Sequence, residues 1–177
     1  MRIISGKYRG KKLKEFDLET TRPTLDRVKE SIFNLIQFDV ANSVVLDLFS
    51  GTGALGVEAI SRGAKKTYLV DKNPQAIKII KENLKGIDAD YQVVNLDYIS
   101  FLNSNNVTFD IVLLDPPFKT DMGLEAINYL ISNNRINDQG IIIFETADER
   151  EFDFNFEGYT IDRRKYGTVA VYKFVKQ

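Results

Sequence analysis

The residues with the clearest chemical potential in this sequence are one acid and three glycines that lie close together. They are Asp47, Gly51, Gly53 and Gly56. The glycines form a Gly-x-Gly-x-x-Gly pattern directly after an apolar stretch at 44–49, and a helical pattern begins near Leu55. A strand, a glycine loop and a helix in this order are typical of a nucleotide-cofactor site, because a backbone without Cβ atoms lets a ligand approach closely.

Asp47 distinguishes between two classes of cofactor for this loop. A dinucleotide would bring a pyrophosphate to the loop, and the carboxylate of Asp47 would repel it. S-adenosylmethionine instead carries an α-ammonium and a sulfonium, and both favour a nearby acid. Asp71 follows the next apolar stretch, 67–70, about 20 residues on, where an acid that binds ribose hydroxyls is expected. We therefore favour S-adenosylmethionine over NAD; the simpler alternative for Asp47 is a solvated or capping acid.

The second group with chemical potential is Asp115-Pro116-Pro117-Phe118, which follows an apolar stretch at 109–114. The two prolines fix the backbone and remove two N–H donors, so the local carbonyl groups remain as acceptors beside the Asp115 carboxylate. Two acceptors could hold both hydrogens of an exocyclic amine while Phe118 stacks on the base. Methyl transfer to that nitrogen would then depend on alignment and on stabilising its new positive charge. The alternative is a Pro-Pro turn with an exposed phenylalanine.

Composition limits the classes of function. The chain has 177 residues, 44% of them hydrophobic and 28% charged, which suits one α/β domain with its own core. It contains no Cys and no His, so a Ser-His-Asp triad, a cysteine nucleophile and a His or Cys zinc site are excluded, and we expect no metal. The apolar runs are too short to span a membrane and the first residues lack an apolar signal region, so we expect a cytoplasmic protein.

From residue 44 onward, strand and helix patterns alternate, which predicts parallel strands with right-handed crossovers. The expected strands are 44–49, 67–70, 91–95, 109–114 and 141–144, and the expected helices are 55–62, 74–84, 99–102 and 123–132. Two further strands, 159–166 and 168–175, should form an antiparallel hairpin. Ligands bind beyond the carboxyl ends of such strands. An acid falls at each of these ends, and the five acids are Asp47, Asp71, Asp97, Asp115 and Glu145.

The N-terminal part is predicted to be a basic extension. Residues 2–16 have the pattern of two short strands around a glycine turn, and residues 1–14 carry six Lys or Arg but no acid. An amphipathic helix should follow from an N-cap at Thr24. We expect a contact with RNA phosphates through Lys11 and Lys12, with a lysine-rich protective edge as an equally weighted alternative. Polar side chains crowd the start of the helix and either face a substrate or serve capping and helix pairing. They are Arg22, Thr24, Asp26, Arg27, Lys29 and Glu30.

These motifs together resemble a known family. Asp47-x-Phe-x-Gly-x-Gly, the acid Asp71, Asp97-Tyr98 and Asp115-Pro-Pro-Phe resemble the motif series of class I S-adenosylmethionine-dependent amino-methyltransferases. Three further stretches resemble the narrower RsmD family of bacterial 16S ribosomal RNA guanine-N2 methyltransferases. They are Arg22-Pro-Thr-x-Asp-Arg-Val-x-Glu, Gly-x-x-Arg-Gly at 6–10 and Ser-Arg-Gly-Ala at 61–64. The resemblance covers nearly the whole chain.

The resemblance implies a Rossmann-like fold and a role for each motif. The methionine end of the cofactor would lie against Asp47, Phe49, Gly51, Thr52 and Gly53. Asp71, with Lys72 beside it, would bind the ribose hydroxyls, and Asp97 would accept a hydrogen bond from the adenine amine next to Tyr98. Asp115, Pro116, Pro117 and Phe118 would hold the target guanine. Arg22, Thr24 and Arg27 would lie near the RNA.

We therefore expect one methyltransferase domain over 1–177, with a hairpin-and-helix extension at 1–42 and a cofactor-binding core at 43–177. Its mostly parallel sheet should have seven strands. We expect a monomer that acts on ribosomal RNA, in an assembled small-subunit particle because no separate RNA module is present. The alternatives are an amino-methyltransferase for DNA adenine or a protein amide, and, from another class, an NAD-dependent oxidoreductase or a non-catalytic nucleotide-binding module.

Overall fold

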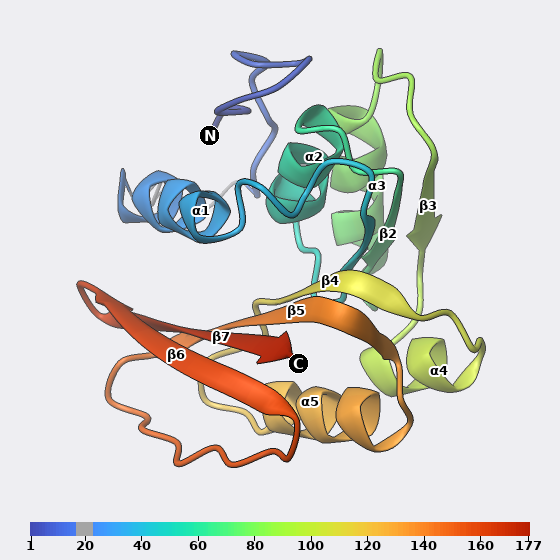
Figure 1. The fold of residues 1–177 in the computed structure, drawn as a ribbon. Helices are drawn as coiled ribbons and strands as arrows, with labels where there is room; N and C mark the ends of the chain where they lie inside the picture. Colours follow the sequence, from blue (N-terminus) through green and yellow to red (C-terminus); the bar gives the residue numbers. More distant parts are fainter. Residues whose placement is uncertain (17–22) are drawn as a thin grey trace.

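A computed structural model describes residues 1–16 and 23–177, and it builds them around one seven-stranded sheet (Figure 1). The strand order is β3-β2-β1-β4-β5-β7-β6. Strands β1 to β5 run parallel, whereas β7 is antiparallel to both β5 and β6. The strands are β1 Val44–Asp47, β2 Lys66–Val70, β3 Tyr91–Val94, β4 Phe109–Leu114, β5 Ile136–Ala147, β6 Tyr159–Tyr166 and β7 Val169–Lys176. The predicted fold class, a mostly parallel sheet with a C-terminal antiparallel hairpin, is confirmed.

Helices cover both faces of the sheet. They are α1 Pro23–Leu35, α2 Ala54–Ser61, α3 Pro74–Asn83, α4 Tyr98–Asn103 and α5 Met122–Ser132. Helices α1, α2 and α3 pack on one face, and α4 and α5 on the other (Figure 1). Val45 and Leu46 of β1 show why two layers form, since neighbouring residues of this strand are both fully buried, one in the core of each face.

Capping residues in the sequence explain where helices α3 and α4 begin after strands β2 and β3. The side chain of Asn73 accepts a hydrogen bond from the backbone N–H of Gln75 (2.9 Å), and Pro74 occupies the first position of α3. Asp97 caps α4 in the same way, because its carboxylate accepts from the N–H of Ser100 (3.0 Å). These two caps fix the paths of the loops that follow β2 and β3.

Two expected strands differ from the structure by two residues or more at an end, and the other boundaries from residue 44 onward agree to within one residue. The strand expected at 141–144 is a 12-residue strand, Ile136–Ala147, because β7 pairs with it as far as Ala147. Glu145 therefore lies inside β5 rather than at its end. Conversely, β1 stops at Asp47, two residues earlier than expected.

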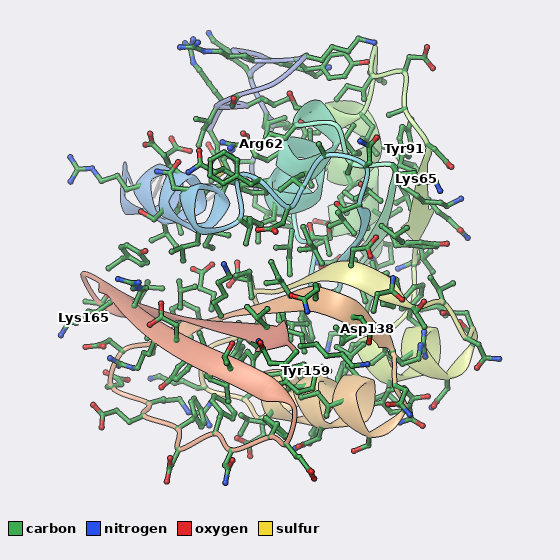
Figure 2. All side chains as sticks on the ribbon, in the orientation of Figure 1. Arg62, Lys65, Tyr91, Asp138, Tyr159 and Lys165 are labelled. Carbon is green, nitrogen blue, oxygen red and sulfur yellow. The ribbon has the colours of Figure 1, made fainter. Side chains whose placement is uncertain are left out.

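The N-terminal hairpin is reduced to a single antiparallel bridge between Arg2 and Lys12. The segment keeps backbone bonds of its own, such as Ile3 N–H to Lys11 O at 3.0 Å and Leu13 N–H to Met1 O at 2.9 Å. It also binds helix α2, since the N–H groups of Ile4 and Ser5 donate to the buried Glu58 at 2.9 and 3.1 Å. The same carboxylate accepts from Arg62 Nε at 2.9 Å, and Arg62 is labelled between α1 and the N-terminal segment in Figure 2. Glu58 thus holds the N-terminal segment against helix α2, which covers one face of the sheet.

Over the described ranges, 1–16 and 23–177, none of the helices has the length and apolar character needed to cross a membrane.

Candidate active site

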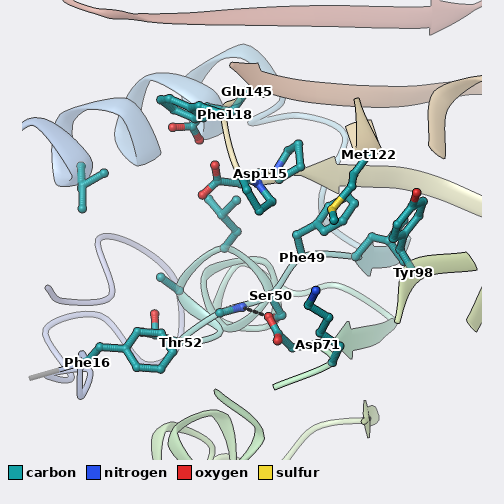
Figure 3. A pocket seen from close by; sticks show the side chains of 18 of the residues that line it. Phe16, Phe49, Ser50, Thr52, Asp71, Tyr98, Asp115, Phe118, Met122 and Glu145 are labelled. Atoms are coloured by element: carbon teal, nitrogen blue, oxygen red, sulfur yellow. Dashed lines mark hydrogen bonds between the residues drawn. The ribbon is translucent and has the colours of Figure 1, made fainter. Parts of the chain in front are cut away.

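One cavity of about 720 Å³ opens beyond the carboxyl ends of the parallel strands, and it collects most of the predicted site residues (Figure 3). Its volume is in the ordinary range for a small-molecule site. The predicted residues that line it are Phe49, Gly51, Thr52, Asp71, Lys72, Asp97, Tyr98, Asp115, Pro116, Pro117 and Phe118. Residues that follow four of the parallel strands, β1 to β4, therefore meet in one place, as the parallel topology requires.

The glycine loop and Asp71 are joined by a direct hydrogen bond. The backbone N–H of Gly51 donates to Asp71 Oδ2 at 2.9 Å (Figure 3), and the N–H of Asn73 donates to the other oxygen at 2.8 Å. Gly51 has φ +57°, and a Cβ at this position would meet no atom within 4 Å, so it would project into the open cavity. The missing side chain leaves room for a ligand against the backbone.

Asp47 and Gly53, both predicted at the methionine end, do not line the cavity. Asp47 is 1% exposed, and its Oδ2 accepts from Ser50 Oγ (2.8 Å) and from the N–H of Gly56 (2.9 Å). It therefore shapes the loop from beneath. Gly53 has φ +83°, and a Cβ there would face Ile80 Cγ1 at 3.2 Å inside the protein. This glycine turns the chain into α2 and packs against the core.

Asp47 is held in an unusual electrostatic state. Its Oδ1 is buried and has no hydrogen-bond partner among the described residues. Burial raises the pKa of the Asp47 carboxyl to about 6, and the negative charge of Asp71 adds to this effect, while the bonds from Ser50 and Gly56 oppose it. A cation in the adjoining cavity would stabilise the ionised form of Asp47.

The wall formed by α4 and α5 holds an aromatic pair. The rings of Phe49 and Tyr98 lie with their centroids 5.3 Å apart. The hydroxyl of Tyr98 donates to a Glu125 carboxylate oxygen on α5, and burial together with this acid raises the pKa of Tyr98 to about 12. The phenol therefore stays protonated at neutral pH and can fix the ring beside Asp97 in the cavity.

Asp115 lies at the end of β4 with its carboxylate open to the cavity, and no described residue donates a hydrogen bond to it. The pKa of Asp115 is raised because protein surrounds the site and because Asp47 is nearby. Water in the open cavity solvates this carboxylate, so the rise is largest when a ligand displaces that water. Arg150 braces the loop that follows, since it donates to the carbonyl oxygens of Phe118 (3.0 Å) and Thr120 (2.6 Å).

The predicted RNA residues lie outside the cavity or outside the described residues. Arg22 falls in the undescribed segment, and of Thr24 only the backbone is described, in the first turn of α1. Arg27 and Lys12 are exposed and do not line the cavity. The ammonium of Lys11 donates to the backbone carbonyl of Lys85, so it anchors the N-terminal segment at the end of α3.

Lys29, one of the polar residues expected to crowd the start of helix α1, lines the cavity. It is 2% exposed, donates to the carbonyl oxygen of Arg2 at 2.7 Å and pairs with Glu58 at 3.4 Å. Burial lowers the pKa of Lys29, and the charge of Glu58 partly restores it. Its spacing of four from Leu25 and three from Ile32 places it on the apolar stripe of α1, which was the available signal. Glu145, expected as one of the rim acids, also lines the cavity, whereas the lining residues Phe16, Leu25, Ser50, Leu55 and Met122 were not predicted.

In the part of the chain that the structure describes, no group of three or more acidic side chains has the arrangement of a metal site. The polar groups that converge on the cavity are carboxylates, hydroxyls and backbone N–H groups. This donor and acceptor set can hold an organic ligand that carries ammonium, ribose and amine groups.

The strand order and the position of the cavity define the class of protein, a class I methyltransferase fold. A solved structure of an Escherichia coli protein superimposes with a TM-score of 0.89 at 31% identity, covering 100% of this chain and 98% of that chain. "Ribosomal RNA small subunit methyltransferase D" of Haemophilus influenzae is 35% identical over 178 residues, which are 98% of this chain and 92% of the relative. The Escherichia coli K12 protein of the same name is 33% identical over 100% of this chain and 90% of its own length.

A family model described as "Conserved hypothetical protein 95" matches residues 1–175. The chain therefore belongs to this family, the RsmD family of methyltransferases, as its motifs indicated.

Proposed function

We propose that this protein transfers a methyl group from S-adenosylmethionine to the exocyclic N2 amine of a guanine in 16S ribosomal RNA. The observation that carries the proposal is the state of Asp115. Its carboxylate opens into the cavity with no donor from residues 1–16 or 23–177, directly before two prolines that offer no N–H group. Such a site lacks donors and presents acceptors, which suits an amine that must be held by its hydrogens.

The cavity residues fit S-adenosylmethionine as the cofactor. The space above Gly51 admits a ligand against the backbone, and the Asp71 carboxylate lies beside it at the end of β2. The buried carboxylate of Asp47 beneath the loop favours a positive charge in the cavity, and the Phe49–Tyr98 pair offers aromatic surface. When bound, this cofactor would supply a methyl group on a sulfonium, an electrophile that an amine nitrogen can attack.

The residues of the chain would then act on the substrate amine. Asp115 and the carbonyl oxygen of Pro116 accept its two hydrogens and so orient the nitrogen lone pair. As the nitrogen gains positive character, the Asp115 carboxylate stabilises it, and filling of the cavity strengthens this interaction because water leaves. Phe118, which lines the same cavity, supports the base by stacking. The nitrogen then releases its proton to water or to a carboxylate of the site.

Two lines of support concern the substrate. The relatives at 33% and 35% identity carry the name ribosomal RNA small subunit methyltransferase D, and they match this chain almost end to end. The exposed basic side chains Arg2, Lys7, Arg9 and Lys12 lie on the N-terminal segment, where they can contact phosphates. Because the chain is small, we propose an assembled small-subunit particle, rather than naked RNA, as the preferred substrate.

Tritiated S-adenosylmethionine provides the test. Small ribosomal subunits from cells that lack this protein, and the matching naked RNA, are incubated with it, digested and analysed for the labelled nucleoside. Label in N2-methylguanosine, stronger from subunits than from naked RNA, is the expected result. Label in another nucleoside or in protein would overturn the guanine assignment, and no binding of S-adenosylmethionine would overturn the methyltransferase assignment.

A further inference from the structure

Glu145 is a second carboxylate in the cavity that the mechanism above does not use. It belongs to β5, whose parallel pairing with β4 brings Leu114 opposite Phe144. The next residues, Asp115 and Glu145, therefore lie at the same level of neighbouring strands, which are about 4.8 Å apart. Figure 3 shows both carboxylates facing the cavity, with Phe118 beside Glu145.

Glu145 is a buried residue whose carboxylate faces the cavity and lacks a partner among the described residues. Glu145 is 5% exposed, and no described residue donates a hydrogen bond or an ion pair to its side chain. Buried polar groups in proteins are nearly always paired, and a buried charge without a partner is costly. Burial and then the charge of Asp115 raise the pKa of Glu145 well above the ordinary glutamate value. A ligand that brings N–H donors would remove this cost.

Two adjacent carboxylates match a ligand with two adjacent donors. Among the four RNA bases, only guanine has a ring N–H, at N1, directly beside an exocyclic amine that could be methylated. Adenine and cytosine instead place a ring nitrogen acceptor beside their amines, and this lone pair would face the second carboxylate. A glutamine amide has an NH₂ group and no neighbouring N–H of this kind.

We propose that Glu145 selects guanine by accepting the hydrogen bond of its N1–H while Asp115 accepts from its N2 amine. The inference rests on the proposed function and adds a specificity residue to it. Glu145 contacts the ring and not the reacting nitrogen, so its effect falls on the choice of base and on orientation. The paired N1–H and N2–H donors also offset the repulsion between the two carboxylates when both are ionised.

The test compares two bases at one position. Subunits are reconstituted with RNA in which the guanosine found by the labelling experiment is kept or replaced by 2-aminopurine riboside. This analogue retains the 2-amino group but has an acceptor at N1. At about pH 8, above the ordinary carboxyl range, the wild-type protein should prefer guanosine by roughly tenfold or more in kcat/KM, as expected for a charge-assisted hydrogen bond.

In Glu145→Gln the amide can either donate or accept, so the preference for guanosine should fall to within about threefold of unity. Binding of S-adenosylhomocysteine, measured by calorimetry, should stay near the wild-type value and verifies the fold. Glu149→Gln is the matched control, because Glu149 is exposed and does not line the cavity. If Glu145→Gln fails to bind S-adenosylhomocysteine, Glu145→Ala decides in the same assay.

The inference is overturned if a folded Glu145 variant keeps the wild-type preference for guanosine. It also fails if the wild-type protein methylates both bases equally. Failure of the proposed function would look different, because the wild-type protein would then leave the guanosine of the subunit unlabelled.

Discussion

Gly6 lies against the backbone of Ser61 so closely that a Cβ on Gly6 would be 1.9 Å from the Ser61 carbonyl oxygen. Three hydrogen bonds surround this contact: Lys7 N–H to Ser61 O at 2.8 Å, Tyr8 N–H to Ser61 Oγ at 3.0 Å, and Ser61 Oγ to Ser5 O at 2.6 Å. Two family motifs that are far apart in sequence, at 6–10 and 61–64, therefore form one joint. This joint places the basic N-terminal segment on helix α2.

The joint predicts different effects for two similar glycines. Gly6 and Gly10 both have positive φ, +89° and +87°, but a Cβ on Gly10 would meet nothing within 4 Å. Gly10→Ala should therefore cost about 1 kcal/mol of unfolding free energy, from backbone strain alone. Gly6→Ala should cost more than about 2 kcal/mol or release the segment, because the Ser61 carbonyl cannot yield. Urea unfolding and hydrogen exchange of the Lys7 and Tyr8 amides measure this difference, and equal behaviour of the two variants would contradict it.

The basic N-terminal segment should contribute to RNA binding through charge. Neutralising Lys11, Lys12 and Lys14 together should weaken binding to small subunits and reduce the slope of log K against log salt by about 1 to 3. Lys12 should account for most of this change, since Lys11 donates to the Lys85 carbonyl and Lys14 pairs with Glu82 at 3.4 Å. Binding isotherms at several salt concentrations provide the measurement. An unchanged slope would identify the segment as a protective edge instead.

Asp47 should make the unfolding free energy of the ligand-free protein depend on pH. Burial raises its pKa from 3.8 to about 6, so the folded state holds this proton more tightly than the unfolded chain. The fold is therefore penalised progressively as pH rises from about 4 through about 6, by up to about 3 kcal/mol. Asp47→Asn keeps an acceptor for Ser50 and Gly56 and removes the charge.

The difference in unfolding free energy, Asp47→Asn minus wild type, should therefore increase between about pH 4.5 and about pH 7.5. We expect an increase of roughly 2 to 3 kcal/mol. Urea titrations of both proteins across this interval give the difference directly. A difference that does not change with pH would show that Asp47 is not stabilised in its protonated form. Binding of S-adenosylmethionine should weaken in the variant, because the ligand loses a favourable negative charge beneath its site.

The elements that sequence predicts well are those with local signals. Asn73 and Pro74 start α3 as expected, and the apolar run 109–114 forms β4 without any change of boundary. The site was also predictable where it depends on topology, since acids that end parallel strands must meet at one edge. Asp71, Asp97 and Asp115 do so in one cavity.

The remainder depends on tertiary contacts that have no local pattern. Residues 2–16 have the pattern of a hairpin, yet several of their N–H groups pair with Glu58 and Ser61, which lie more than fifty residues away. Asp47 and Gly53 carry the motif of a ligand loop, but their side-chain positions point into the protein, where they shape that loop. Glu145 is predicted as a rim acid, but its burial in the middle of the sheet follows only from the pairing of β7 with β5.

The most direct test of the account separates cofactor binding from transfer in Asp115→Ala. Calorimetry with S-adenosylmethionine should give an affinity within about threefold of the wild-type value, because the proposed mechanism gives Asp115 a contact with the substrate amine and none with the cofactor loop. Methyl transfer to small subunits should fall by about 10² to 10³ or more, as when a group that stabilises transition-state charge is removed. A variant that binds the cofactor and transfers methyl groups at the wild-type rate would contradict the central role given to Asp115.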